Sequence, residues 1–178
     1  MAVLTRIAAG FTFLFTSSTL KSSNERANTE VKAKASLSGN LVSGEAEFFQ
    51  PRYTLNTEIK IKATGLNPNK SHGLQIHELT KDGQAAEIFN PFARKHGGPW
   101  STERKVGDIG NIKGDEKGEG AYTISDPYIK LSGKFSVIGK IIAIHENPDD
   151  LGYGRNDESL VDGQAGKAIS AGAISQIS

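Results

Sequence analysis

Cysteine is absent from this chain of 178 residues. Its absence excludes disulfide bonds, thiolate metal sites and a cysteine nucleophile, and it leaves the cellular compartment open. An excess of one charge sign is also missing, because 21 Lys and Arg residues oppose 20 Asp and Glu residues. Without a basic or an acidic field, neither nucleic acid nor a polycation is an expected partner.

Aromatic residues and helical periodicity are both scarce. Phe, Trp and Tyr make up 7% of the chain, whereas glycine occurs 20 times. Apolar and polar residues alternate over short runs that end at turn residues, which predicts an all-β domain. Eight strands are expected, separated by long loops at 79–103 and 146–166, and this order indicates a Greek-key sandwich or a flattened barrel. The expected strands lie at about 31–38, 44–49, 54–64, 73–78, 105–112, 119–125, 137–145 and 168–174.

Residues 1–28 differ from the rest of the chain. Arg6 precedes an apolar run from Ile7 to Phe15, and small and hydroxyl residues follow it. This order is typical of a secretory signal peptide, which predicts a secreted protein or one of the secretory pathway. A mitochondrial presequence and a retained, disordered or anchoring tail are the alternatives, and the run is too short for a comfortable membrane span. Residues 29–178 are expected to form the folded domain.

The histidines are the candidate site residues. His72, His77 and His96 lie close together in the chain, and His145 lies far downstream. His77 falls in an expected strand two residues after Gln75, so both side chains point to the same face. Two histidines with this spacing could clamp one metal ion, but here one of the pair is glutamine.

Several segments, taken together and in order, resemble one family. They are GLQIHE, FNPFARKHGGP, VGDIGNI, LSGK, VIGKIIAIHENPDDLGYGRNDES and AGKAISAGAI. Over residues 31–175 the chain resembles copper/zinc superoxide dismutase. The resemblance implies an eight-stranded Greek-key β-barrel, an immunoglobulin-like sandwich, with a zinc-bearing loop and an electrostatic loop. It also implies copper that is alternately reduced and oxidised by superoxide, and zinc that organises the neighbouring loop.

The resemblance places the family's copper ligands on four positions of this chain. His77 and His145 keep two of the histidines. Gln75 stands in place of another, and Ile88 stands where the family has the histidine that bridges copper and zinc. An isoleucine carries no ligand atom, and an amide oxygen is a weak ligand for copper.

The zinc positions are changed to the same extent. His96 and Asp108 are kept, whereas Lys105 replaces a histidine and Ile88 removes the bridge. An ammonium group opposes a cation in a partly buried site. These changes predict that no catalytic residue and no metal site survives and that the chain has no cofactor. Copper or zinc bound weakly by the remaining histidine pair is the alternative.

Other positions of the resemblance bear on assembly. Ala168 stands where the family has the arginine that attracts superoxide, and Ala171 stands at a disulfide cysteine. Loss of such a disulfide costs about 2–5 kcal/mol of stability. The loop from 77 to 88, which supports the dimer interface in the family, is shorter than usual. We therefore do not expect the usual dismutase dimer.

Two further positions have structural interpretations. His72 matches a family histidine that hydrogen-bonds within the barrel, and we expect that role here. Asp149 matches the carboxylate that orients a ligand of each metal. Here we expect Asp149 to accept hydrogen bonds from Gln75, His96 or loop amides. His96 with Asp108 is expected to pin a loop as a hydrogen bond or an ion pair.

Two functional hypotheses follow. The sequence predicts an inactive, metal-free dismutase-like protein that serves as a structural or protein-interaction module with an unidentified protein partner. Trp100 is a candidate anchor for that partner, and a cap on the end of the barrel is its alternative role. The alternative function is a copper-binding protein with weak or altered dismutase activity at His77 and His145. No nucleophile–base pair, phosphate loop or HExxH spacing indicates a different enzyme.

Overall fold

The structure, a computed structural model, describes residues 30–51 and 53–178. The expected targeting segment, residues 1–28, lies outside the described residues. No helix in the described part of the chain is long and apolar enough to cross a bilayer. The elements are β1 Val31–Ser38, β2 Ser43–Gln50, β3 Thr57–Thr64, β4 Ser71–Leu79, β5 Ala85–Ile88, β6 Asp108–Lys113, β7 Gly120–Asp126, β8 Ile141–His145, α2 Ser159–Asp162, β9 Ala168–Ala173 and β10 Ser175–Ile177.

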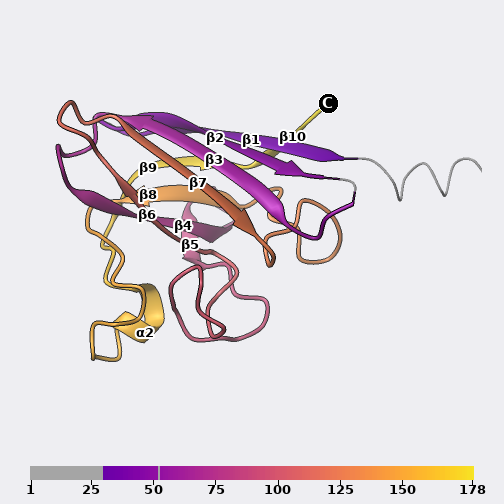
Figure 1. Cartoon of the computed structure of the whole chain (residues 1–178). Coiled ribbons are helices and arrows are strands. Elements are labelled where there is room, and N and C mark those ends of the chain that lie inside the picture. Colours follow the sequence, from indigo (N-terminus) through magenta and orange to yellow (C-terminus); the bar gives the residue numbers. More distant parts are fainter. Residues whose placement is uncertain (1–29, 52) are drawn as a thin grey trace, which may run out of the picture.

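The strands form one curled antiparallel sheet (Figure 1). Its main path runs β5-β4-β8-β9-β1-β2-β3-β7, while β6 pairs with β4 and β10 pairs with β1. Neighbours that are distant in sequence, such as β4 with β8 and β3 with β7, give the connections of a Greek key. The predicted all-β fold of the dismutase type is confirmed.

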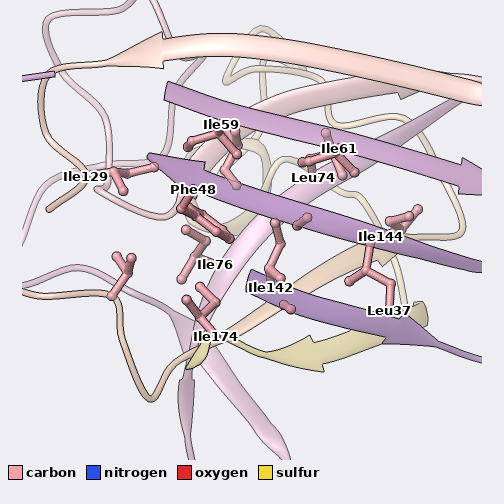
Figure 2. Close-up of a cluster of buried hydrophobic side chains, with 14 of the residues drawn as sticks. Leu37, Phe48, Ile59, Ile61, Leu74, Ile76, Ile129, Ile142, Ile144 and Ile174 are labelled. Atoms are coloured by element: carbon pink, nitrogen blue, oxygen red, sulfur yellow. The ribbon is translucent and has the colours of Figure 1, made fainter. Parts of the chain in front are cut away.

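Alternation along the strands builds the core. In β3, every second side chain from Thr57 to Ala63 is buried, and the lysines between them are exposed. Ile76 and Ile142 pack in the same interior with Phe48, as Figure 2 shows. A half-buried antiparallel strand requires this period of two.

Strands β4 and β8 are buried on both faces, and they carry three of the four histidines. From His72 to His77 in β4, and along all of β8, the side chains are buried. One face of each strand faces the hydrophobic core. The loop with α2 and the loop between β5 and β6 lie on the side of the sheet away from β1 to β3 (Figure 1). The outer faces of β4 and β8 are therefore the place where loop residues meet strand residues.

The sequence missed two short strands and misplaced some boundaries. β5 lies inside the expected loop 79–103, and three of its four residues are exposed, so it carries no alternation. β10 is exposed throughout. The strands expected from 54, 105 and 137 begin later, at Thr57, Asp108 and Ile141, because turns and bends precede them.

Candidate metal centre

His77 and His145 meet on the outer face of β4 and β8. The two strands pair antiparallel, and the ladder between β8 and β9 shifts register between Ile144 and His145. Such a bulge re-aims the side chain beside it. The Nε2 atoms of His77 and His145 lie 3.0 Å apart, and their ring centroids lie 5.2 Å apart.

The other ring nitrogen of each histidine fixes its tautomer. His77 Nδ1 lies 2.9 Å from the carbonyl oxygen of Ala86, and His145 Nδ1 lies 2.8 Å from that of Gly166. A carbonyl oxygen only accepts, so each Nδ1 carries the proton and donates it. In the neutral rings, both Nε2 atoms are then lone-pair donors that face each other. Such a pair of nitrogens is stabilised by a cation that both lone pairs share, either a proton or a metal ion.

Protonation does not readily supply that cation at neutral pH. Burial, the neighbouring His145 and the charge of Lys105 lower the pKa of His77 to about 4, against the hydrogen bond to Ala86. Burial also lowers the pKa of His145. Both imidazoles are therefore neutral near pH 7, which is the form that binds metals.

A series of hydrogen-bonded polar side chains begins at Gln75, on the same face of β4 as His77. Gln75 Nε2 donates to Asp149 Oδ2 at 2.9 Å and to the carbonyl oxygen of Asp162 at 2.8 Å. Asp149 Oδ1 also accepts from His96 Nε2 and from the backbone N–H of Leu151, each at 2.8 Å. The predicted role of Asp149 as an acceptor for Gln75, His96 and a loop amide is confirmed.

His96 lies between two carboxylates. Its Nδ1 is 2.8 Å from Asp108 Oδ1, and its Nε2 is 2.8 Å from Asp149 Oδ1. Burial disfavours the cation, but the hydrogen bonds and charges of the two carboxylates outweigh burial and raise the pKa of His96 to about 9. His96 is thus an imidazolium that ties its loop to β6 and to the loop after β8, and the expected ion pair with Asp108 is confirmed.

Among the residues that the structure describes, one group of three side chains could hold a metal ion. Ligand atoms of His96, Asp149 and Asp150 lie within 4.8 Å of one another. The sequence indicated no role for Asp150. Asp150 accepts from the Ser159 hydroxyl and from Gln164 Nε2, each at 2.8 Å. These contacts are made by the folded loop, so no local sequence pattern indicates them.

The substituted positions surround the histidine pair. Ile88 ends β5, pairs with His77 and is buried. Lys105 lies in the loop before β6, and its Nζ donates to the carbonyl oxygen of Val161 at 2.7 Å. A cavity of about 290 Å³ opens over the pair. Its walls include Gln75, His77, Ile88, Lys105 and His145, together with Glu87 and Asp162.

The remaining predicted positions have clear places. His72 donates from Nδ1 to the His145 carbonyl at 2.8 Å, while its Nε2 accepts from the Asn67 N–H at 3.3 Å, so the expected bonding within the barrel is confirmed. Ala168 begins β9 and pairs with His145, and Ala171 lies within β9. Trp100 is 79% exposed, and its role as an anchor stays a prediction.

The sequence missed a buried ion pair. Arg104 Nη2 donates to Asp126 Oδ2, and neither side chain is exposed to solvent. Arg104 Nη1 also donates to the Asp108 carbonyl at 3.0 Å, so the pair links the loop before β6 to the end of β7. In sequence, Arg104 is one of several charges in an irregular stretch, and nothing local marks it as buried.

Residues 42–174 match the sequence model of copper/zinc superoxide dismutase. The chain belongs to the copper/zinc superoxide dismutase family. It is 40% identical over 168 residues to "Superoxide dismutase [Cu-Zn]" of Paramecium bursaria Chlorella virus 1, which covers 92% of this chain and 88% of that protein. It is 40% identical over 149 residues to the protein of the same name from Saccharomyces cerevisiae, and 41% to that from Candida glabrata. Each of these covers 81% of this chain and 97% of the relative.

These relatives contradict three sequence-based expectations: that the chain is inactive, that it is metal-free and that it has no cofactor. The family members that it resembles at this level are named as copper–zinc enzymes. The group of His96, Asp149 and Asp150 could also hold a metal ion. The expectation failed because it counted the family's ligand positions one by one. It gave no weight to the geometry that the folded chain builds from the ligands it keeps.

Proposed function

We propose that this chain is a metal-binding superoxide dismutase whose copper is held by His77 and His145, in a site altered from that of the family. The observation that carries the proposal is the pair of facing, unprotonated Nε2 atoms 3.0 Å apart. Two nitrogens at this separation both reach one ion at metal–nitrogen distances of about 2.0–2.1 Å. The names of the relatives support copper as that ion.

The chain holds the two imidazoles in place through backbone atoms. The carbonyl groups of Ala86 and Gly166 accept the Nδ1 protons and so present Nε2 to the shared position. Metal-ligating histidines commonly donate their other ring N–H in this way. Ile88 contributes an apolar wall to the same cavity. Copper, when bound, supplies one-electron chemistry by which two superoxide anions and two protons become dioxygen and hydrogen peroxide.

Zinc is the second metal in the names of the relatives. His96, Asp149 and Asp150 supply imidazole and carboxylate donors, which zinc accepts. His96 would have to lose a proton to bind it, because both of its nitrogens face carboxylates. We propose this group as the place for a second cation, and we expect zinc binding there to weaken as pH falls.

Metal content and dismutase activity test the copper proposal together. The purified chain is offered copper and zinc, washed, and analysed by mass spectrometry for metals. We expect about one copper per chain, and we expect His145→Ala and His77→Ala to lose both the copper and the activity, since one imidazole alone is a weak site. Glu47→Gln, on the exposed face of β2, is the matched control for adventitious surface binding.

Two results would contradict the proposal. One is substoichiometric copper together with no dismutase activity in the unaltered chain. The other is copper that survives in both histidine variants, which would place it elsewhere on the surface.

A further inference from the structure

The cavity over His77 and His145 has one cationic side chain among the described residues that line it, Lys105. Glu87 and Asp162 lie in the same wall and carry negative charge. The substrate of a dismutase is an anion, so the two carboxylates oppose its entry. At Ala168, where the family resemblance places a guiding arginine, this chain has no charge. Attraction for an anion must come from another side chain of the cavity.

Lys105 is free to provide that attraction. Lys105 is a half-buried residue. Its ammonium group has three N–H donors, and one of them is used by the Val161 carbonyl at 2.7 Å. Within the described residues, no carboxylate lies at ion-pair distance from its Nζ. The bond to Val161 holds the charge at the cavity wall and leaves N–H donors for an incoming anion.

The charge of Lys105 also reaches the histidine pair. It contributes to the low pKa of His77, together with burial and His145. The positive charge that disfavours protonation of His77 attracts an anion that approaches the same ring. Charge in a cavity with low-dielectric walls raises the local concentration of an oppositely charged substrate and its association rate.

We propose that Lys105 draws superoxide and other small anions into this cavity and positions them beside His77 and His145. This assignment rests on the proposed dismutase function and adds to it a substrate-positioning residue. Lys105 occupies a place where the family resemblance has a zinc ligand, so the same substitution that changes the zinc site supplies the missing positive charge.

The test compares Lys105→Gln and Lys105→Arg with the unaltered copper-loaded protein. Glutamine removes the charge but keeps an N–H donor for the Val161 carbonyl, and arginine keeps the charge. Lys62→Gln, on the exposed side of β3 and lining a different cavity, is the control for net charge. Copper content is measured for each variant, followed by azide affinity from the visible spectrum and the dismutation rate constant against salt concentration.

We expect Lys105→Gln to weaken azide binding and lower the rate constant at low salt by about three- to tenfold, and to flatten the salt dependence. Lys105→Arg and Lys62→Gln should stay close to the unaltered protein. Unchanged azide affinity and salt dependence in copper-loaded Lys105→Gln would overturn the role of Lys105 while leaving the dismutase proposal intact.

Absence of copper from the unaltered protein would instead overturn the dismutase proposal. The anion site is then tested by titrating the metal-free protein with azide and monitoring the titration by nuclear magnetic resonance. An azide-dependent shift at His77 that disappears in Lys105→Gln would support the anion site, and its absence from the unaltered protein would overturn it.

Discussion

At the scale of single residues, Asp149 joins Gln75 on β4 to His96 in the loop between β5 and β6. It accepts hydrogen bonds from Gln75, His96 and the Leu151 N–H, and its side chain is 1% exposed. Three N–H groups already donate to this buried carboxylate, so a side chain that itself carries an N–H donor does not fit in its place. Its charge also keeps His96 protonated.

Asp149→Asn should therefore destabilise the protein although the side chain keeps its shape. The amide places N–H groups against donors and removes a charge partner of His96, which we expect to cost about 2–4 kcal/mol. Urea unfolding of the metal-free protein measures the change. Asp157→Asn, an exposed aspartate in the same loop, is the control and should stay within about 0.5 kcal/mol. Equal effects of the two substitutions would show that the buried contacts of Asp149 contribute little.

At the scale of elements, the short helix α2 ends against the side chains of Asp149 and His96. Gly163 is its C-cap residue, with a φ of 69° in the left-handed region. A Cβ added there would lie 2.2 Å from Asp149 Oδ1 and 2.4 Å from His96 Nε2. A glycine is thus needed both for the backbone turn and for the close approach of the loop to the ion pair.

Gly163→Ala should be far more destabilising than Gly133→Ala. Gly133 has a similar φ of 82°, but an added Cβ meets nothing within 4 Å there. Gly133→Ala therefore reports the backbone penalty alone, about 1–2 kcal/mol. Gly163→Ala adds the clash with Asp149 and His96, and we expect at least about 2 kcal/mol more. Thermal and urea unfolding measure both variants. Matching losses of stability would mean that the loop moves away from the ion pair without cost.

At the scale of the whole molecule, the buried histidines should make the free energy of unfolding largest at an intermediate pH and smaller on either side of it. The folded-state pKa of His96, about 9, is above its ordinary value of 6.5, so the folded protein binds the extra proton between these limits. The free energy of unfolding should then fall as pH rises from about 6.5 to 9, by up to about 1.4 kcal/mol per pH unit. The folded-state pKa of His77, about 4, is below 6.5, so stability should also fall as pH drops from 6.5 to 4.

Urea unfolding of the chelator-treated protein across pH 4 to 9 measures this profile. Nuclear magnetic resonance of the histidine rings then assigns each limb to its residue. A profile that stays flat above pH 6.5, or rises there, would contradict the imidazolium assigned to His96.

The sequence determined the all-β class, most strands and the family. Alternation is a local consequence of strand geometry, and it shows in β1 and β3 without any tertiary information. The match in order of GLQIHE, FNPFARKHGGP and the segments after them was sufficient to identify copper/zinc superoxide dismutase as the family. The sequence also placed Asp149 with Gln75 and His96, because the resemblance supplied their proximity.

Only the tertiary structure decided the state of the site. The tautomers of His77 and His145 depend on the backbone carbonyls of Ala86 and Gly166, and those atoms are the same in every residue type. The charge of His96 depends on two carboxylates that are 12 and 53 positions away in the chain. The burial of Arg104 depends on Asp126 in the same way. The residue type at a ligand position shows which ligand atoms are available. The protonation state of that side chain, and the atoms it can contact, depend on groups that folding brings together.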